Sequence, residues 1–207
     1  MTLVAVLDYG IGNLRSAQKG LEKVGADARL TDDPGLVRDA AAVVLPGVGN
    51  FGRCMEALRA HHLDDLVHEV VGAGTPFAGI CVGMQMLYDG SDESPDVPGL
   101  GVLPGRVRLI PGDVKRPQMQ WNRLDVVAPS GLLDGLDDPV WVYFVHSYAA
   151  DADDSLVATC DYGGPVTAAV HRNNVWATQF HPEKSGPNGL RILANFVALA
   201  DRVSVDR

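Results

Sequence analysis

The segment Gly79-Ile80-Cys81-Val82-Gly83 places a cysteine between two glycines, where an apolar run gives way to a helical pattern. A nucleophile between a strand and a helix occupies a strained turn, and small residues on either side let the neighbouring backbone pass close by. The positive end of the following helix would favour the Cys81 thiolate, and the Val82 N–H would point towards a developing oxyanion. Free cysteines are often buried, so these five residues alone also fit a structural cysteine.

A second motif, His181-Pro182-Glu183, stands 100 residues after Cys81, at the end of a predicted strand. A cysteine nucleophile needs a histidine as base and a carboxylate that orients the histidine. Alternation along an extended chain predicts that His181 and Glu183 lie on the same side, and Pro182 favours an extended backbone at His181. The tripeptide alone also fits an ordinary solvated turn. Together with the Cys81 motif it predicts a Cys–His–Glu triad.

A third motif, Pro46-Gly47-Val48-Gly49, ends the apolar run that starts at residue 41. Glycines on both sides of Val48 permit backbone conformations that aim an N–H group into a cleft. In a parallel sheet this loop would lie at the same carboxyl edge as Cys81, where open α/β sheets bind their ligands. A plain glycine-rich turn is the alternative, and the shared edge favours a role in the site.

The elements that must position these motifs alternate over the first 80 residues. Strands are predicted at 3–8, 27–32, 41–47 and 75–80, with helices between them. Apolar strands that alternate with helices predict a parallel sheet covered on both faces. From about residue 100, strand-like segments follow one another and predict antiparallel additions, and helical spacing returns after Pro187. We therefore expect one α/β domain over residues 1–207, with a central mixed, mostly parallel sheet flanked by helices.

The composition argues against several classes of function. Seventeen basic and 26 acidic residues give a net charge of −9, without the basic run that a nucleic acid partner would require. No apolar run is long enough for a membrane helix, and the N-terminal run has no basic leader, so we expect a cytoplasmic protein. Three widely spaced cysteines match neither a disulfide framework nor a paired zinc site, and no metal or cofactor is expected.

With these motifs the chain resembles the class I, triad-type glutamine amidotransferases. The resemblance runs nearly end to end and is strongest to one branch, the glutamine amidotransferase subunits of imidazole glycerol phosphate synthases in histidine biosynthesis. The segments that carry it are 8–16 (DYGIGNLRS), 45–52 (LPGVGNFG), 79–87 (GICVGMQML), 119–122 (MQWN), 143–148 (YFVHSY) and 179–185 (QFHPEKS). It implies the flavodoxin-like fold of that family. Gln118 and Gln120 depart from it, because the family usually has a histidine and a glycine there.

The resemblance implies a mechanism for these residues. Cys81 would attack the side-chain amide of glutamine, His181 would transfer the protons, and Glu183 would orient the imidazole. Ammonia would leave, and water would hydrolyse the glutamyl thioester to glutamate. The N–H groups of Val48 and Val82 would stabilise the oxyanions.

The resemblance also implies residues for the substrate and for a partner. The positions matching those that hold glutamine in the family are Gly49, Gln85, Glu93, Ser147 and Tyr148. The ammonia would pass to a cyclase subunit with a (β/α)8 barrel, and the positions expected to contact that barrel are Trp121, Asn122 and Lys184. Ordinary structural roles also fit these residues, such as a core position for Trp121 or a solvated charge for Glu93.

Two other functions fit parts of the sequence. One is a glutaminase subunit with another partner, such as that of pyridoxal phosphate synthase, against which DYGIGNLRS and YFVHSY argue. The other is a non-catalytic α/β module that binds a partner or a small molecule. That module would be expected to lose a triad position, and the sequence retains all three.

Overall fold

The computed structural model describes the backbone of residues 1–205 and the side chains of residues 1–203. Its centre is an eight-stranded sheet, in which the first five strands run parallel and the last three are antiparallel. In sheet order these strands are β2 (Asp27–Thr31), β1 (Leu3–Leu7), β3 (Ala42–Gly47), β4 (Phe77–Cys81), β13 (Val175–Thr178), β12 (Pro165–Arg172), β11 (Leu156–Asp161) and β8 (Asp125–Val126). The predicted mixed, mostly parallel sheet is confirmed.

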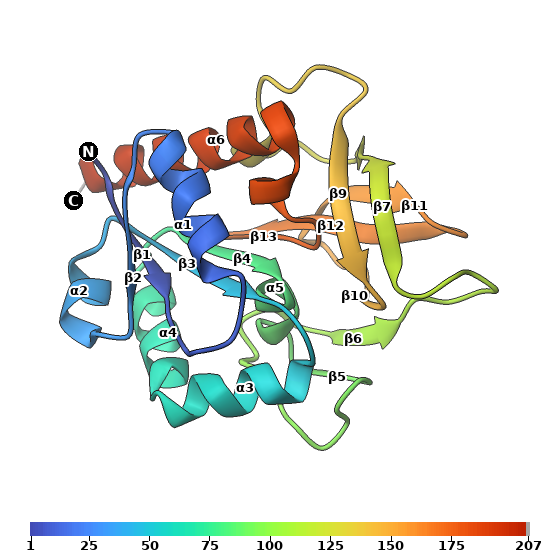
Figure 1. Cartoon of the computed structure of the whole chain (residues 1–207), viewed down its shortest axis with the longest axis horizontal. Coiled ribbons are helices and arrows are strands. Elements are labelled where there is room, and N and C mark those ends of the chain that lie inside the picture. Colours follow the sequence, from blue (N-terminus) through green and yellow to red (C-terminus); the bar gives the residue numbers. More distant parts are fainter. Residues whose placement is uncertain (206–207) are drawn as a thin grey trace.

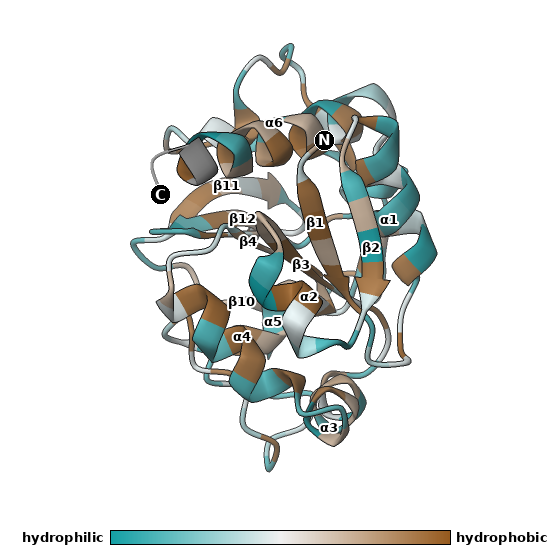
Figure 2. Cartoon of the chain, turned by 90° about the vertical axis from the view of Figure 1, so that its left-hand side faces the viewer, coloured by the Kyte–Doolittle hydropathy of each residue, from teal (hydrophilic) through white to brown (hydrophobic). Residues whose placement is uncertain are grey.

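Helices cover both faces of this sheet (Figure 1). Helices α1 and α6 lie along one face, and α3, α4 and α5 lie along the other. Their bounds are α1 (Leu14–Lys23), α2 (Pro34–Asp39), α3 (Phe51–Ala60), α4 (Leu63–Gly72), α5 (Val82–Met86) and α6 (Gly186–Val205). Every residue of β3 is buried, and Figure 2 shows the apolar β1 and β3 lying between the helices. Burial on both faces is why these strands have no polar alternation.

Two smaller sheets lie beside the main one. The first contains β10 (Tyr148–Ala150), β6 (Arg106–Leu109) and β5 (Gly90–Ser91). The second pairs β7 (Gln118–Arg123) with β9 (Trp141–His146) and is called the β7–β9 ribbon below. Two short 3-10 turns are η1 (Gly131–Leu133) and η2 (Pro182–Lys184).

These sheets correct part of the prediction for the second half of the chain. Only β12, β11 and β8 extend the main sheet as antiparallel strands, whereas β13 pairs parallel with β4. The ribbon forms a sheet of its own, and its side chains Met119 and Trp121 are 61% and 48% exposed. Trp121 is therefore not a core residue. Over residues 1–205, no helix has the length and apolar character to cross a bilayer.

Candidate active site

Cys81 lies at the turn between β4 and α5. Its backbone has φ 56° and ψ −114°, a left-handed conformation that is strained for a residue with a side chain. The two glycines of the motif permit close packing there. A Cβ on Gly83 would lie 1.8 Å from the Leu45 carbonyl oxygen, and one on Gly79 would meet the following helix at 3.0 Å. The strained turn expected from the G-x-C-x-G pattern is confirmed.

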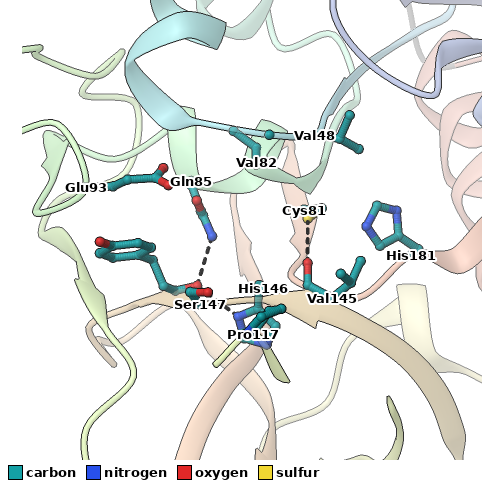
Figure 3. A pocket seen from close by; sticks show the side chains of 12 residues that line it. Val48, Cys81, Val82, Gln85, Glu93, Pro117, Val145, His146, Ser147 and His181 are labelled. Atoms are coloured by element: carbon teal, nitrogen blue, oxygen red, sulfur yellow. Dashed lines mark hydrogen bonds between the residues drawn. The ribbon is translucent and has the colours of Figure 1, made fainter. Parts of the chain in front are cut away.

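A cavity of about 250 Å³ opens over the Cys81 thiol (Figure 3). It collects segments that are far apart in the sequence, because β4 and β13 are neighbours and the end of β9 closes the opposite wall. Its lining residues are Val48, Gly49, Cys81, Val82, Gln85, Glu93, Pro117, Val145, His146, Ser147, Tyr148 and His181. The structure thus brings the predicted nucleophile, the predicted base, and all the predicted oxyanion and substrate residues around one cavity.

His181 follows β13, the parallel neighbour of β4, so its imidazole reaches the edge where Cys81 lies. Its Nδ1 lies 2.8 Å from Glu183 Oε1, and the two side chains are only 2% and 3% exposed. His181 itself is extended, as expected, but Pro182–Lys184 form a 3-10 turn. The expectation that strand alternation brings the two together was therefore wrong, since a turn does so.

The charge state of His181 reflects two opposing effects. Burial, the largest single effect, lowers its pKa, but the neighbouring Cys81 and Glu183 together outweigh it and raise the pKa to about 9. Nε2 of His181 is buried and has no hydrogen-bond partner among the described residues, while Nδ1 is committed to Glu183. This arrangement leaves Nε2 for proton transfer in the cavity, and Glu183 favours the charged ring.

Two buried side chains hold the carbonyl groups of the Pro46–Gly49 loop. The Tyr9 hydroxyl donates to Pro46 O at 2.6 Å, and the Cys54 thiol donates to Val48 O at 3.3 Å. Burial raises the pKa of both groups, that of Cys54 to about 11, so both remain protonated donors. Gly49 has φ +93°, a conformation that glycine adopts without strain. No sequence pattern pointed to Tyr9 or Cys54, because their partners are backbone atoms.

Gln85 and Glu93 line the cavity, but part of each side chain is already bonded. Gln85 Nε2 donates to Tyr148 O at 2.9 Å and to Gln179 Oε1 at 3.0 Å, which leaves its own carbonyl oxygen for a ligand. Glu93 Oε2 accepts the Phe51 N–H at the start of α3 at 2.7 Å. A ligand in the cavity would therefore meet the side chains of Gln85 and Glu93 in orientations that these hydrogen bonds already fix.

Two polar residues around this site, Gln179 and His146, were missed from the sequence, and a third, Gln118, was noted only as a departure from the family. Gln179 is fully buried, and its Nε2 lies 3.8 Å from Cys81 Sγ. His146 lines the cavity, and the buried Gln118 lies behind it, with its Oε1 3.0 Å from His146 Nε2. A polar residue directly after an apolar strand was the available signal for Gln179, since a buried group of this kind needs a partner.

The residues expected at a partner surface lie outside the cavity. Trp121 is 48% exposed on the β7–β9 ribbon, with its ring edge against Tyr143, and Lys184 is exposed on η2. Asn122 is half-buried, and its Nδ2 donates to Asp161 O at 2.8 Å within the chain. Trp121 and Lys184 are thus accessible to a partner, whereas the amide donor of Asn122 is already used.

Comparison with known proteins identifies the family of the chain that forms this site. Residues 5–200 match the sequence model of the glutamine amidotransferase class-I family. The chain belongs to that family. Among the described residues of this amidotransferase, no group of three or more His, Cys, Asp or Glu side chains is arranged to hold a metal ion.

Curated relatives of the amidotransferase are similar over nearly their whole length. Imidazole glycerol phosphate synthase subunit HisH of Syntrophotalea carbinolica is 50% identical over 203 residues, covering 94% of this chain and 98% of the relative. The subunit of the same name from Methanothermobacter thermautotrophicus is 49% identical over 201 residues, covering 95% and 98%.

Solved structures agree with the fold of the amidotransferase. A crystal structure described as a glutamine amidotransferase superposes with a TM-score of 0.76 at 23% identity, covering 96% of this chain and 98% of the other. The structure of PurLQS from Thermotoga maritima gives a TM-score of 0.77 at 19% identity, covering 96% and 99%. At these identities the similarity supports the shared α/β architecture.

Proposed function

We propose that this chain is the glutaminase subunit of imidazole glycerol phosphate synthase, with Cys81, His181 and Glu183 as its catalytic triad. The observation that carries the reaction is the cavity in which Cys81 and a Glu183-bound His181 meet. The identity of 49–50% to subunits named HisH, over almost the full length of both chains, supports the choice of synthase. A cytoplasmic location is part of the same proposal.

The reaction begins at the side-chain amide of glutamine. The Cys81 thiol gives its proton to His181 and its sulfur attacks the amide carbon. The amide oxygen becomes an oxyanion, which the N–H groups of Val48 and Val82 stabilise. His181 then gives a proton to the amide nitrogen, the C–N bond breaks, and ammonia leaves from a glutamyl thioester. Water adds to the thioester as His181 takes one of its protons, and the C–S bond breaks to release glutamate.

Substrate contacts follow from the lining of the cavity. Gln85 offers a carbonyl oxygen and Glu93 a carboxylate, which suit the ammonium group of an amino acid, whereas Gly49, Ser147 and Tyr148 lie around the same space. These groups leave the side chain of glutamine to extend towards Cys81. Acceptors on one wall and the nucleophile on another explain selection for an amino acid that carries a terminal amide.

The ammonia is proposed to react at an acceptor site in a second protein. Ammonia released into neutral water becomes ammonium, which is no nucleophile, so direct delivery to an acceptor site favours a heterodimer with an ammonia passage between its subunits. The proposed partner is the (β/α)8-barrel cyclase subunit, which completes the lyase reaction of the synthase. Trp121, Asn122 and Lys184 are proposed to contact it, and the exposure of Trp121 and Lys184 supports this surface.

The function is tested by the Cys81→Ala variant, assayed together with the cyclase. Glutamine-dependent formation of imidazole glycerol phosphate should fall at least about 10³-fold, because no other group in the site can form the thioester. Synthesis from added ammonium salts should keep the wild-type rate, since that step belongs to the cyclase. Glu69→Gln, at a surface ion pair with Arg38, is the control and should retain glutaminase activity. Equal loss of both activities in Cys81→Ala would contradict the proposal.

A further inference from the structure

Behind one wall of the cavity, buried polar side chains form a continuous hydrogen-bonded row between two cysteines. The row begins at Cys160 of β11 and ends at Cys81, and its members are Gln118, His146, the Tyr148 carbonyl, Gln85 and Gln179. The exposures of Gln118, Gln179, Gln85 and His146 are 0%, 0%, 3% and 6%. Buried polar groups need partners, so each member restricts the orientation of the next.

The imidazole of His146 has an unusual environment, because both of its ring nitrogens face oxygen atoms. Nδ1 lies 2.8 Å from Tyr148 O, and Nε2 lies 3.0 Å from Gln118 Oε1. A backbone carbonyl can only accept, so Nδ1 must carry a hydrogen. A hydrogen on Nε2 as well would make the ring a cation. Burial opposes that charge and lowers the pKa of His146 to about 4, and the nearby His181 lowers it too.

A neutral ring with its hydrogen on Nδ1 has a bare Nε2 that needs a donor. The Gln118 amide supplies one if it is turned so that its NH2 group faces His146, an orientation that has almost the same shape. Its carbonyl oxygen then accepts from the thiol of Cys160, whose Sγ lies 3.6 Å from the amide. Burial raises the pKa of Cys160 to about 11, so this thiol keeps its proton. The facing groups of Cys160, Gln118 and His146 are then all paired without a net charge.

We infer that Gln118 and His146 are positioning residues for the glutaminase site: Gln118 donates to Nε2, fixes the Nδ1–H form of His146, and thereby holds the Tyr148 carbonyl and Gln85. The inference rests on the proposed function, because the positioned groups line the glutamine cavity. From Gln85 the row continues through Gln179 to the Cys81 thiol. A residue that never touches the substrate thus sets the wall against which glutamine binds.

The first test is spectroscopic and does not depend on activity. The nitrogen shifts of His146 in the ¹⁵N-histidine-labelled chain, assigned by loss of the signal in His146→Asn, should report a neutral ring with its hydrogen on Nδ1 at pH 7. The isosteric Gln118→Glu variant offers only acceptors, so it should convert His146 to the charged form at the same pH. A charged ring or an Nε2–H ring in the wild type, or no change in Gln118→Glu, would overturn the inference.

The second test is kinetic and uses the complex with the cyclase. Gln118→Leu removes the donor to His146 and should raise the KM for glutamine about tenfold, with kcat changed much less, because ground-state positioning is lost. Gln120→Leu, the same change on the exposed side chain two residues along β7, should leave the KM unchanged. An active wild-type complex with no rise in KM for Gln118→Leu would overturn this inference alone. A wild-type complex without glutamine-dependent activity would instead overturn the proposed function.

Discussion

The two walls of the cavity hold their functional groups in different ways. On the main-sheet side, the turn at Cys81 is fixed by backbone packing, with Gly83 and Gly47 at places where a Cβ would lie 1.8 and 2.6 Å from neighbouring backbone atoms. Hydrogen bonds from Tyr9 and Cys54 add to this packing at the Pro46–Gly49 loop. On the side of the β7–β9 ribbon, His146 and Gln118 are fixed by a hydrogen bond to each other and by one from His146 to the Tyr148 carbonyl. Steric packing tolerates no added atom, whereas a hydrogen-bonded row can be altered in steps.

This contrast indicates where each kind of substitution should act. Changes on the main-sheet side should remove catalysis or unfold the chain, because the proposed nucleophile and its proposed base lie at one edge of tightly paired strands. Changes on the ribbon should adjust substrate affinity or partner binding and leave the fold intact, because much of that surface is exposed. The following predictions test the contrast, and those with the greatest expected change come first.

Glu183→Gln tests the main-sheet side through its chemistry. The amide keeps the shape but loses the charge that orients and stabilises the protonated His181, so kcat for glutamine should fall about 10³-fold. Glu69→Gln is the matched control, since Glu69 is paired with Arg38 at the surface and should leave kcat unchanged. A loss of less than about tenfold in Glu183→Gln would show that the contact with His181 is only structural.

The same pair makes a prediction about pH. Because the folded pKa of His181 is raised from 6.5 to about 9, its contribution to stability is fully present below pH 6.5 and is lost as the pH rises through 9. Urea unfolding of the wild type should therefore show a falling free energy of unfolding across this window. The fall should be smaller in Glu183→Gln. Identical pH profiles for the two proteins would contradict the assigned cause.

Gly83→Ala tests the packing of the same edge. The new Cβ would lie 1.8 Å from Leu45 O, so β3 and α5 must separate and the free energy of unfolding should fall by about 3 kcal/mol. Gly72→Ala at the end of α4 meets nothing within 4 Å and should raise the free energy of unfolding by up to about 1 kcal/mol, because alanine has the higher helix propensity. Urea titrations of both variants make the comparison. A free energy of unfolding in Gly83→Ala equal to that of the wild type would show that β3 and α5 can separate without loss of stability.

Trp121→Ala tests the ribbon. The indole is half exposed and contacts Tyr143, so its loss should change the free energy of unfolding by less than about 1 kcal/mol. Binding of the cyclase should nevertheless weaken about 30-fold, as expected when a tryptophan anchor is lost from an interface. Trp141→Ala, which removes a similarly exposed indole from β9, is the comparison variant in both the unfolding and the cyclase-binding measurements. Wild-type affinity for the cyclase in Trp121→Ala would remove this residue from the proposed surface.

Much of the fold could be predicted because its signals are local. The buried strand Ala42–Gly47 and the amphipathic helix Leu14–Lys23 appear in the sequence as an apolar run and as helical spacing. The strained turn at Cys81 was predicted because glycines two positions away on both sides are typical of a turn that packs closely against neighbouring backbone. The second half of the chain was predicted less well. Alternation identifies a strand but does not say which neighbour it pairs with, so the parallel pairing of β13 with β4 was missed.

The groups that could carry the chemistry were identifiable from the sequence alone, because Cys81, His181 and Glu183 stand in short motifs whose spacing reflects local backbone geometry. How these groups meet depends on the tertiary structure. The 3-10 turn after His181 sets the contact with Glu183, and the neighbouring strands β4 and β13 bring the imidazole to the cavity that Cys81 lines. The Gln118–His146 contact was likewise hidden, since a hydrogen bond between distant buried side chains leaves no periodicity in the sequence.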